Sequence, residues 1–167
     1  MADLKSEIAQ AAPFSSIEEE AILNLMRTSD CMQRVFQERT RGWGLTSTQY
    51  NVLRILRGAG PQGLTCAAIG GRMITAEPDI TRLLGRLKNF RLIRQHRDRH
   101  DRRAVWTQIT DAGLEILREM DPTIQRIPVD LLRHLSRAEL AEMIRLLEQA
   151  RQGCAGATPD KNTAAHD

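Results

Sequence analysis

Apolar side chains recur along most of this chain at spacings of three and four residues, the period of a helix that buries one face. A serine or threonine followed three residues later by Glu or Gln, a capping box, indicates where such a helix begins. Boxes of this kind occur at Ser16–Glu19, Thr46–Gln49 and Ser136–Glu139. We therefore expect helices at about 16–39, from 46 to near Gly58, and from 136 to about 150.

Shorter elements lie between these helices. Thr65 can cap a short helix, and Thr75 can cap another at 76–89, whose apolar face is mainly leucine. Two further segments, 92–97 and 104–109, are predicted to be the strands of a hairpin. The order helix, short helix, turn, basic helix and hairpin is that of a winged helix-turn-helix.

A further helix is expected to begin at Thr110–Asp111, and it contains Pro122 and Pro128. Each proline removes a backbone donor, so we expect this helix to be kinked or divided. The predicted fold class is mainly α with a small β-hairpin wing. The expected segments are a flexible N-terminal arm at 1–15, a helix at 16–41, the winged helix-turn-helix at 45–110, helices at 111–152 and a disordered tail at 153–167.

Composition narrows the class of protein. Apolar residues make up 41% of the 167 residues but aromatic ones only 4%, which favours a Leu, Ile, Met and Ala core between helices. No apolar run approaches the roughly 20 residues that span a membrane, and the N-terminus lacks the residue order of a signal peptide. We therefore expect a cytoplasmic protein with no membrane partner.

Charge is unevenly distributed. The formal net charge is only +3, but residues 72–103 hold ten Lys and Arg against four Asp and Glu, while all other positions hold 14 against 17. A basic segment on a slightly acidic body is typical of a protein that turns one face toward phosphate. A charged hairpin that is merely solvated would give the same counts, so charge alone leaves that alternative open.

Several short motifs follow one another in a familiar order. They are Leu45-Thr46, Gln49-Tyr50, Leu64-Thr65, Pro78-Asp79-Ile80-Thr81-Arg82-Leu83, Asp101-Arg102-Arg103-Ala104, Ile109-Thr110 and Gly113. With them, residues 16–150 resemble the MarR family of bacterial and archaeal transcriptional regulators. One departure is Phe90-Arg91, where members often carry Lys-Gly or a similar pair.

The resemblance implies a homodimer whose N- and C-terminal helices interleave and whose two winged helices read a palindromic operator in double-stranded DNA. It places the helix 76–89 in the major groove and the wing 98–103 in the minor groove. Many members of the family sense a small aromatic or phenolic effector. We expect no cofactor.

Candidate DNA contacts come partly from the resemblance, which implies Thr81, Arg82 and Arg103, with Asp101 holding the wing arginine by a salt bridge. The charge pattern and the expected first helical turn add Thr75, Glu77, Asp79, Arg86, Arg99 and Arg102. Thr75 is favoured as a helix cap over a DNA contact. The acids can accept from a cytosine amino group but would repel phosphate, and the arginines have a plain solvated face as their alternative.

Candidates for lining an effector cleft are Met26, Met32, Trp43 and Met73. Methionines at helical spacing usually belong to a core, so this assignment has a structural alternative. His96 and His100 are four residues apart, but across a predicted strand end, which favours surface histidines over a metal site.

The three cysteines lack metal-site spacing and leave an odd thiol in any disulfide scheme. Cys31 is expected to be buried and inert within a helix, Cys66 to lie in the first turn of a short helix, and Cys154 to lie in the tail. A thiol switch at Cys31 or Cys66 stays open as an alternative.

The hypothesis that unites these features is a dimeric, ligand-responsive DNA-binding regulator, expected to be a repressor. The alternatives are a redox-sensing regulator of the same fold and a winged helix used for protein contacts. The sequence presents no paired carboxylates in a cleft-forming context, no nucleophile with a base and no Gly-rich phosphate loop, which argues against an enzyme.

Overall fold

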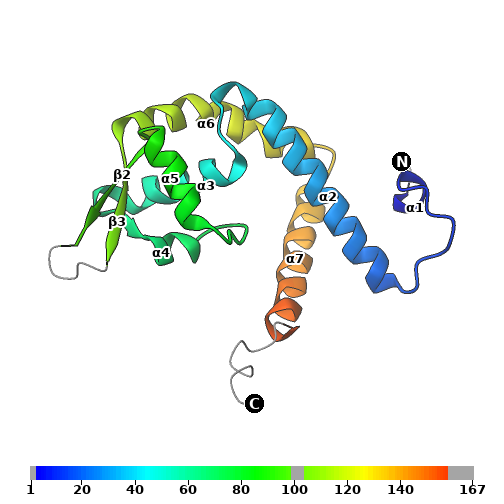
Figure 1. Ribbon diagram of the computed structural model, residues 1–167. Helices are drawn as coiled ribbons and strands as arrows, with labels where there is room; N and C mark the ends of the chain where they lie inside the picture. The colour runs from blue at the N-terminus through cyan, green and yellow to red at the C-terminus, as the bar shows by residue number, and fades with distance from the viewer. Residues whose placement is uncertain (1–2, 99–103, 158–167) are drawn as a thin grey trace, which may run out of the picture. The chain divides into compact units, whose positions relative to one another are not determined.

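Figure 1 shows the computed structural model, which describes residues 3–98 and 104–157. Helices dominate and a small antiparallel sheet is present, so the predicted fold class is confirmed. The chain divides into two compact units, Met1–Ile127 and Pro128–Asp167. The elements in chain order are α1 (Leu4–Glu7), α2 (Ile17–Thr40), η1 (Arg41–Trp43), α3 (Ser47–Ala59), η2 (Gly60–Gln62), β1 (Leu64–Thr65), α4 (Cys66–Gly70), α5 (Ile80–Asn89), β2 (Ile93–Arg97), β3 (Val105–Ile109), α6 (Asp111–Leu132) and α7 (Arg137–Ala157).

The capping boxes at α3 and α7 form as predicted. At α3, the Gln49 backbone N–H donates to the Thr46 hydroxyl over 3.2 Å, and the Thr46 N–H donates to the Gln49 side chain over 2.9 Å. At α7, Ser136 and Glu139 exchange the corresponding bonds at 3.3 and 2.7 Å. These bonds satisfy backbone donors that the first helical turn leaves without partners.

The box at α2 forms only in part. The Glu19 N–H donates to the Ser16 hydroxyl over 3.2 Å, but the Glu19 carboxylate accepts from the backbone and the hydroxyl of Ser15, each at 2.7 Å. The helix still begins where the sequence predicts.

One hydrophobic core lies in the first unit, between α3, α4, α5, the sheet and α6. Its side chains with no solvent exposure include Leu53 and Leu56 of α3, Leu87 of α5 and Leu117 of α6. The Tyr50 ring packs against Phe36 of α2 with centroids 5.7 Å apart, which joins α2 to this core. Outside the apolar contacts, Arg57 and Asp121 tie α3 to α6 through two hydrogen bonds of 2.7 and 3.0 Å.

The sheet contains the predicted hairpin and a strand that the sequence analysis missed. The strand order is β1-β3-β2, all antiparallel, with Leu64 opposite Thr107 and His96 opposite Trp106. The added strand β1 is two residues long, and Gly63 precedes it with φ +72°. A Cβ at Gly63 would lie 2.3 Å from the Thr107 carbonyl oxygen, so glycine allows β1 to approach β3.

The expected start of the basic helix, at residue 76 behind a Thr75 cap, is wrong. The helix α5 begins at Ile80, and its N-cap is Asp79, whose carboxylate accepts from the Arg82 N–H over 2.9 Å. A Thr75 cap would accept from the N–H of residue 77 or residue 78, and Pro78 has none, so a helix starting there keeps only one of the two usual donors, whereas Asp79 finds its donor at Arg82. Thr75 lies in a bend before the helix.

Three other boundaries differ from expectation. α6 runs unbroken through Pro122 and Pro128, so these prolines do not divide the helix, and a kink at either one stays a prediction; both prolines occupy exposed positions of the helix. α7 extends to Ala157, past the expected limit at residue 152. In the N-terminal arm, α1 forms a single turn with Leu4 buried.

Candidate nucleic-acid interface

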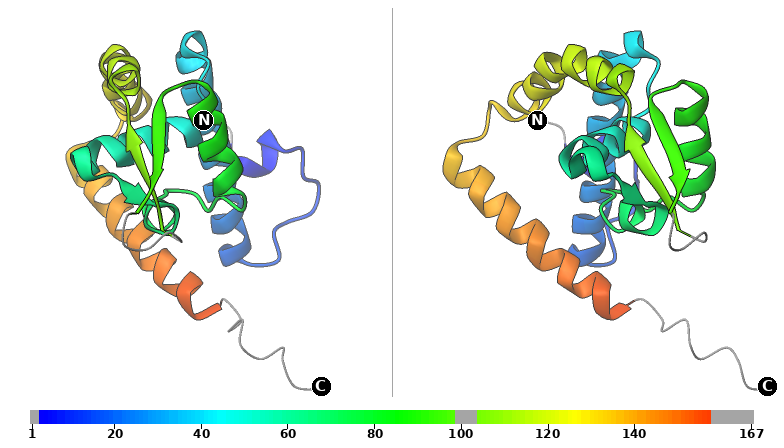
Figure 2. Two further views of the ribbon diagram at one scale, coloured as in Figure 1. Left: turned by 60° about the vertical axis from the view of Figure 1, so that its left-hand side comes forward. Right: turned by 90° about the vertical axis from the view of Figure 1, so that its left-hand side faces the viewer.

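The helix α5 has one buried face and one polar face. Leu83, Leu84 and Leu87 are buried against the core, as their spacing of one, three and four residues requires. Thr81, Arg82 and Arg86 are exposed on the rest of the helix surface. In both views of Figure 2, α5 lies beside the β2–β3 hairpin, and the helix is in contact with β2.

The turn before α5 contains the two predicted acidic contacts. Asp79 is exposed, but its carboxylate is engaged in capping the helix, where a negative charge is favourable. Glu77 is half-buried and Thr75 is exposed. Asp79 therefore caps the N-terminus of α5, the role that was predicted for Thr75.

The hairpin is braced on its outer face by a chain of side-chain hydrogen bonds. Arg94 Nε donates to Gln108 Oε1 over 2.8 Å, and Gln108 Nε2 donates to the Pro61 carbonyl over 2.6 Å. These bonds connect β2, β3 and η2. They hold the base of the wing against the end of α3.

Trp106 supplies a second brace nearer the wing tip. Its indole N–H donates to the Asp98 carboxylate over 3.0 Å, and the Asp98 N–H donates to the Ala104 carbonyl over 2.9 Å. Trp106 was not among the predicted site residues; strand register places it opposite His96. The predicted contacts Arg99, Arg102 and Arg103, and the wing-stabilising Asp101, lie outside the described residues, as does His100.

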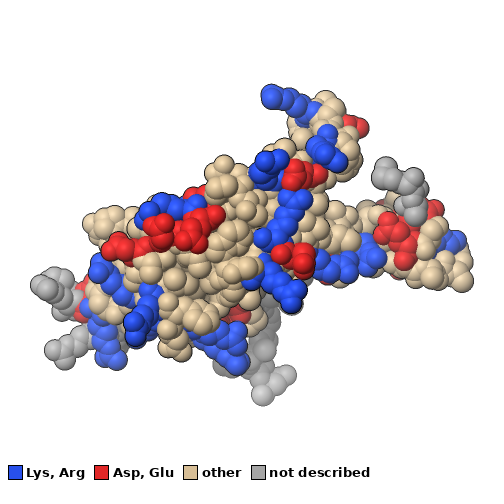
Figure 3. Space-filling view, turned by 90° about the horizontal axis from the view of Figure 1, so that it is seen from above, with Lys and Arg blue, Asp and Glu red and all other residues tan. Residues whose placement is uncertain are grey.

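All described basic side chains of the 72–103 segment are exposed. They are Arg72, Arg82, Arg86, Lys88, Arg91, Arg94 and Arg97. Figure 3 shows Lys and Arg side chains gathered next to the β2–β3 hairpin. A surface of this kind attracts a polyanion and releases its counterions on contact.

The four predicted effector residues do not share one environment. Met26 is 63% exposed on α2, and Met32 is half-buried on the same helix. Trp43 and Met73 pack against the core, and Met73 Sδ accepts from the Asn51 side chain over 3.7 Å. A separate pocket lies at the wing, lined by Pro61, Gln62, His96, Asp98, Trp106 and Gln108.

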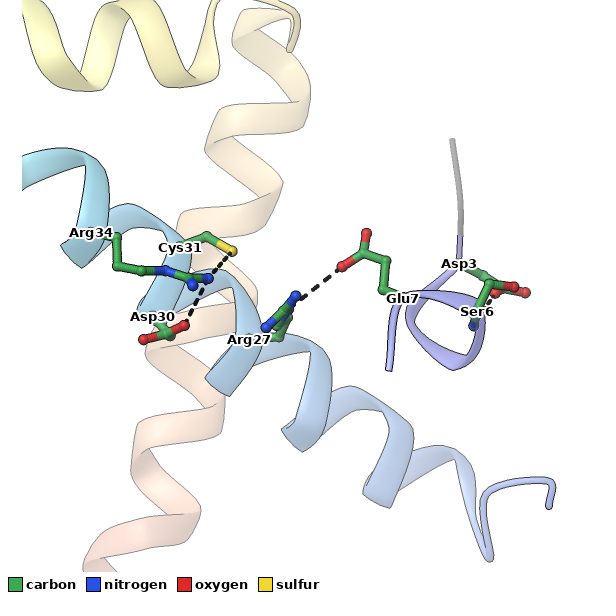
Figure 4. A network of polar contacts seen from close by, with 7 residues as sticks. All are labelled: Asp3, Ser6, Glu7, Arg27, Asp30, Cys31 and Arg34. Carbon is green, nitrogen blue, oxygen red and sulfur yellow. Dashed lines mark hydrogen bonds and ion pairs between the residues drawn. The ribbon is translucent and has the colours of Figure 1, made fainter. Parts of the chain in front are cut away.

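The cysteines differ partly from expectation. Cys31 is exposed, not buried, because α2 turns this position away from the core. Figure 4 shows its sulfur beside Arg34, whose guanidinium donates to it over 3.4 Å and pairs with Asp30 at 2.9 Å. The bond to Cys31, followed by the charge of Asp30, raises the pKa of Arg34.

The other two thiols are a half-buried Cys66 and an exposed Cys154, and neither forms a disulfide. Within residues 3–98 and 104–157, no three His, Cys, Asp or Glu side chains are grouped closely enough to hold a metal ion. In the same ranges, no helix is both long and apolar enough to cross a membrane.

Comparison with known proteins identifies the family. The model of the MarR family matches residues 43–104. A MarR transcription factor from Planctomyces limnophilus, known from its crystal structure, is 39% identical, with a TM-score of 0.63 over 82% of this chain and 99% of that one. The chain belongs to the MarR family. It is a DNA-binding, winged-helix transcriptional regulator, and no catalytic family is indicated.

Two further comparisons concern relatives at lower identity. The transcriptional regulator HosA of Escherichia coli O157:H7 is 25% identical over 71% of this chain and 90% of its own. Bordetella bronchiseptica BpsR, whose DNA binding is regulated by 6-hydroxynicotinic acid, is 25% identical, with a TM-score of 0.71 over 80% of this chain and 99% of its own.

Proposed function

We propose that this MarR-family regulator acts in the cytoplasm as a homodimeric repressor that places α5 in the major groove of a palindromic operator and the wing in the minor groove. The observation that carries the proposal is the polar face of α5. Its leucines are buried while Thr81, Arg82 and Arg86 are free to meet DNA, beside a hairpin that is also basic. The width of the major groove admits a helix with such side chains.

Exposed apolar side chains support the dimer. On α2, Ile22, Leu25 and Met26 are 59%, 46% and 63% exposed and fall on one face of the helix. On α7, Ile144 and Leu146 are 54% and 50% exposed. An apolar stripe like the one on α2 is typical of an interface, and α2 and α7 flank the winged helix in the sequence.

An aromatic effector is the proposed signal. BpsR responds to a small aromatic acid, and this chain shares its fold. Met26, Met32, Trp43 and Met73 are the side chains we propose for the cleft, with Trp43 able to stack on a planar ring. Because the four occupy different environments within one chain, this proposal requires the dimer to bring them together. An effector that binds one dimer geometry more tightly would shift the spacing of the two winged helices away from that of the operator half-sites.

The test of the DNA-binding proposal is Arg82→Ala, measured against a duplex from the region upstream of the gene at several salt concentrations. We expect a loss of roughly 1–3 kcal/mol if Arg82 contacts a base edge. Arg126→Ala, which removes an exposed arginine from α6, is the matched control and should leave affinity unchanged. Equal binding by Arg82→Ala and the parent at every salt concentration would remove Arg82 from the interface.

A second candidate is redox control of the same DNA binding, favoured by the exposure of Cys31 and its contact with the Arg34 cation. A peroxide would oxidise the thiolate to a sulfenic acid and be reduced to hydroxide. Operator binding by the parent and Cys31→Ser, before and after peroxide, tests it; Cys66→Ser addresses the other thiol. A response that survives both substitutions would exclude this candidate. A chain that binds no DNA at all would favour the protein-contact module.

A further inference from the structure

Gly85 lies in the middle of α5, on the face that is turned away from the core. It is one residue from Arg86, three from Arg82 and four from both Thr81 and Asn89, so these side chains surround it on the helix surface. Glycine inside a helix is destabilising relative to alanine, because it gains no side-chain contact and loses the most backbone freedom on folding. Its presence at this position needs a reason.

Neither of the usual structural reasons applies. The first reason is a positive φ, which residues other than glycine rarely adopt: Gly44 and Gly60 have φ values of +65° and +70°. The second is a close contact: a Cβ on Gly63 or Gly113 would lie 2.3 Å from a backbone oxygen. Gly85 has a helical φ, and a Cβ built on it meets nothing within 4 Å among the described residues. The fold would therefore accept a side chain at position 85.

The remaining difference between Gly85 and its neighbours is the surface on which it lies. Arg82 and Arg86 are long, exposed side chains, and Gly85 between them is partly exposed and has no side chain of its own. A side chain at position 85 would stand at the centre of the polar face, where it would be among the first groups to meet a surface placed against the helix. The missing side chain leaves a notch in a basic face.

We propose that Gly85 is a specificity-determining residue: the notch lets a base edge on the floor of the major groove approach the backbone of α5. This inference rests on the proposed function, because it requires α5 to lie in the groove. Contacts with phosphate supply affinity for any sequence, whereas contacts with base edges supply the preference for one. Filling the notch should therefore reduce specific binding and leave non-specific binding intact.

The experiment compares the full-length parent with Gly85→Ala and Gly58→Ala. Gly58 is the matched control, since it also lies in a helix, is exposed and has nothing within 4 Å of a built Cβ. The probes are a duplex selected by the parent from a random pool and an unrelated duplex of equal length. In a second selection, the Gly85→Ala variant itself selects duplexes from the same random pool.

We expect Gly85→Ala to raise the thermal midpoint, as alanine does inside a helix, yet to bind the selected duplex about tenfold more weakly, a loss of roughly 1.4 kcal/mol. Its affinity for the unrelated duplex should be unchanged, and its own selection should differ from that of the parent at one base pair in each half-site. Gly58→Ala should bind both duplexes like the parent.

Affinities of Gly85→Ala and the parent within twofold on the selected duplex would overturn this inference while leaving the proposed function in place. A parent chain that selects no sequence from the pool would overturn the proposed function, and the role of Gly85 with it. An equal loss of affinity on both duplexes would also overturn the inference, because it would indicate damage to the helix as a whole.

Discussion

At the scale of single residues, Arg91 occupies a conformation that favours glycine. Its φ is +58°, and it follows the C-cap of α5. The N–H groups of Leu92 and Arg91 donate to the carbonyls of Leu87 and Lys88 at 3.0 and 2.9 Å, which is the pair of bonds of a Schellman motif. The Thr110 hydroxyl donates to the Arg91 carbonyl over 2.8 Å and helps to hold this backbone in place.

We therefore expect Arg91→Gly to stabilise the fold by about 1 kcal/mol, because an L side chain in the left-handed region costs energy that glycine does not. Urea denaturation of the two chains would measure the difference. Arg91→Ala is the control: it removes the guanidinium but keeps the Cβ, so it should give no comparable gain. Equal gains from both variants would assign the effect to charge and not to backbone strain.

Tyr50 is the only tyrosine in the chain, which makes its phenol easy to follow. Burial, the largest influence, raises the pKa of Tyr50 above its ordinary value of about 10. Above that pH the folded chain keeps a proton that the unfolded chain has released, so the free energy of unfolding should fall as pH rises. Below pH 10 this group should have no effect.

Phenolate absorbance should therefore show a titration midpoint in the folded chain above that of the same chain in denaturant. Tyr50→Phe should remove the corresponding part of the fall in stability at alkaline pH. A folded-state midpoint at or below the denatured one would contradict the burial of this ring.

At the scale of elements, Gly113 sets how closely α6 approaches the sheet. A Cβ at this position would lie 2.3 Å from the Leu92 carbonyl oxygen and 2.7 Å from Ile109 Cγ1. The start of α6 therefore packs on the backbone just before β2 and on the end of β3. The same two segments connect α5 and the wing to the rest of the unit.

Gly113→Ala should destabilise the fold by about 2 kcal/mol or more, since backbone and core must move to admit the methyl group. Gly153→Ala, in α7 with nothing within 4 Å of its built Cβ, is the control and should be neutral or stabilising. Circular dichroism during thermal unfolding would compare the two. A Gly113→Ala chain as stable as the parent would mean that this contact is not tight.

The order of elements could be predicted from sequence because most of its signals are local. The boxes at Thr46 and Ser136 fix two helix starts, and both strands of the hairpin fall within the predicted segments 92–97 and 104–109. The start of α5 could not be placed, because Thr75 and Asp79 are both able to cap and Pro78 stands between them. The strand β1 is also invisible in the sequence, since two residues carry no periodicity and pair only after Gly63 turns toward β3.

The candidate DNA-binding site could also be predicted only in part. Helical period alone places Leu83 inward and Arg82 outward. The engagement of Asp79 as a cap depends on where α5 begins, and the bond between Trp106 and Asp98 depends on strand register. Exposure of Cys31 depends on how α2 packs, which helical spacing does not determine.

At the scale of the whole molecule, the proposed dimer depends on apolar surface that the single chain leaves uncovered. Leu25→Glu places a charge within the exposed stripe of α2 and should make the chain monomeric, because burying an unpaired carboxylate is costly. Thr28→Glu adds the same charge to the same helix, away from the centre of the stripe, and should leave the dimer intact. Sedimentation would separate the two outcomes, and a parent chain that sediments as a monomer would reject the dimer.

The bond between Trp106 and Asp98 also has a practical consequence. The chain contains two tryptophans, and the other, Trp43, packs against the core. In a Trp43→Phe chain, all indole emission would therefore come from Trp106 in the wing. A bound duplex would displace water from that indole and shift the wavelength of its fluorescence emission. DNA binding at the wing could therefore be followed without an attached dye.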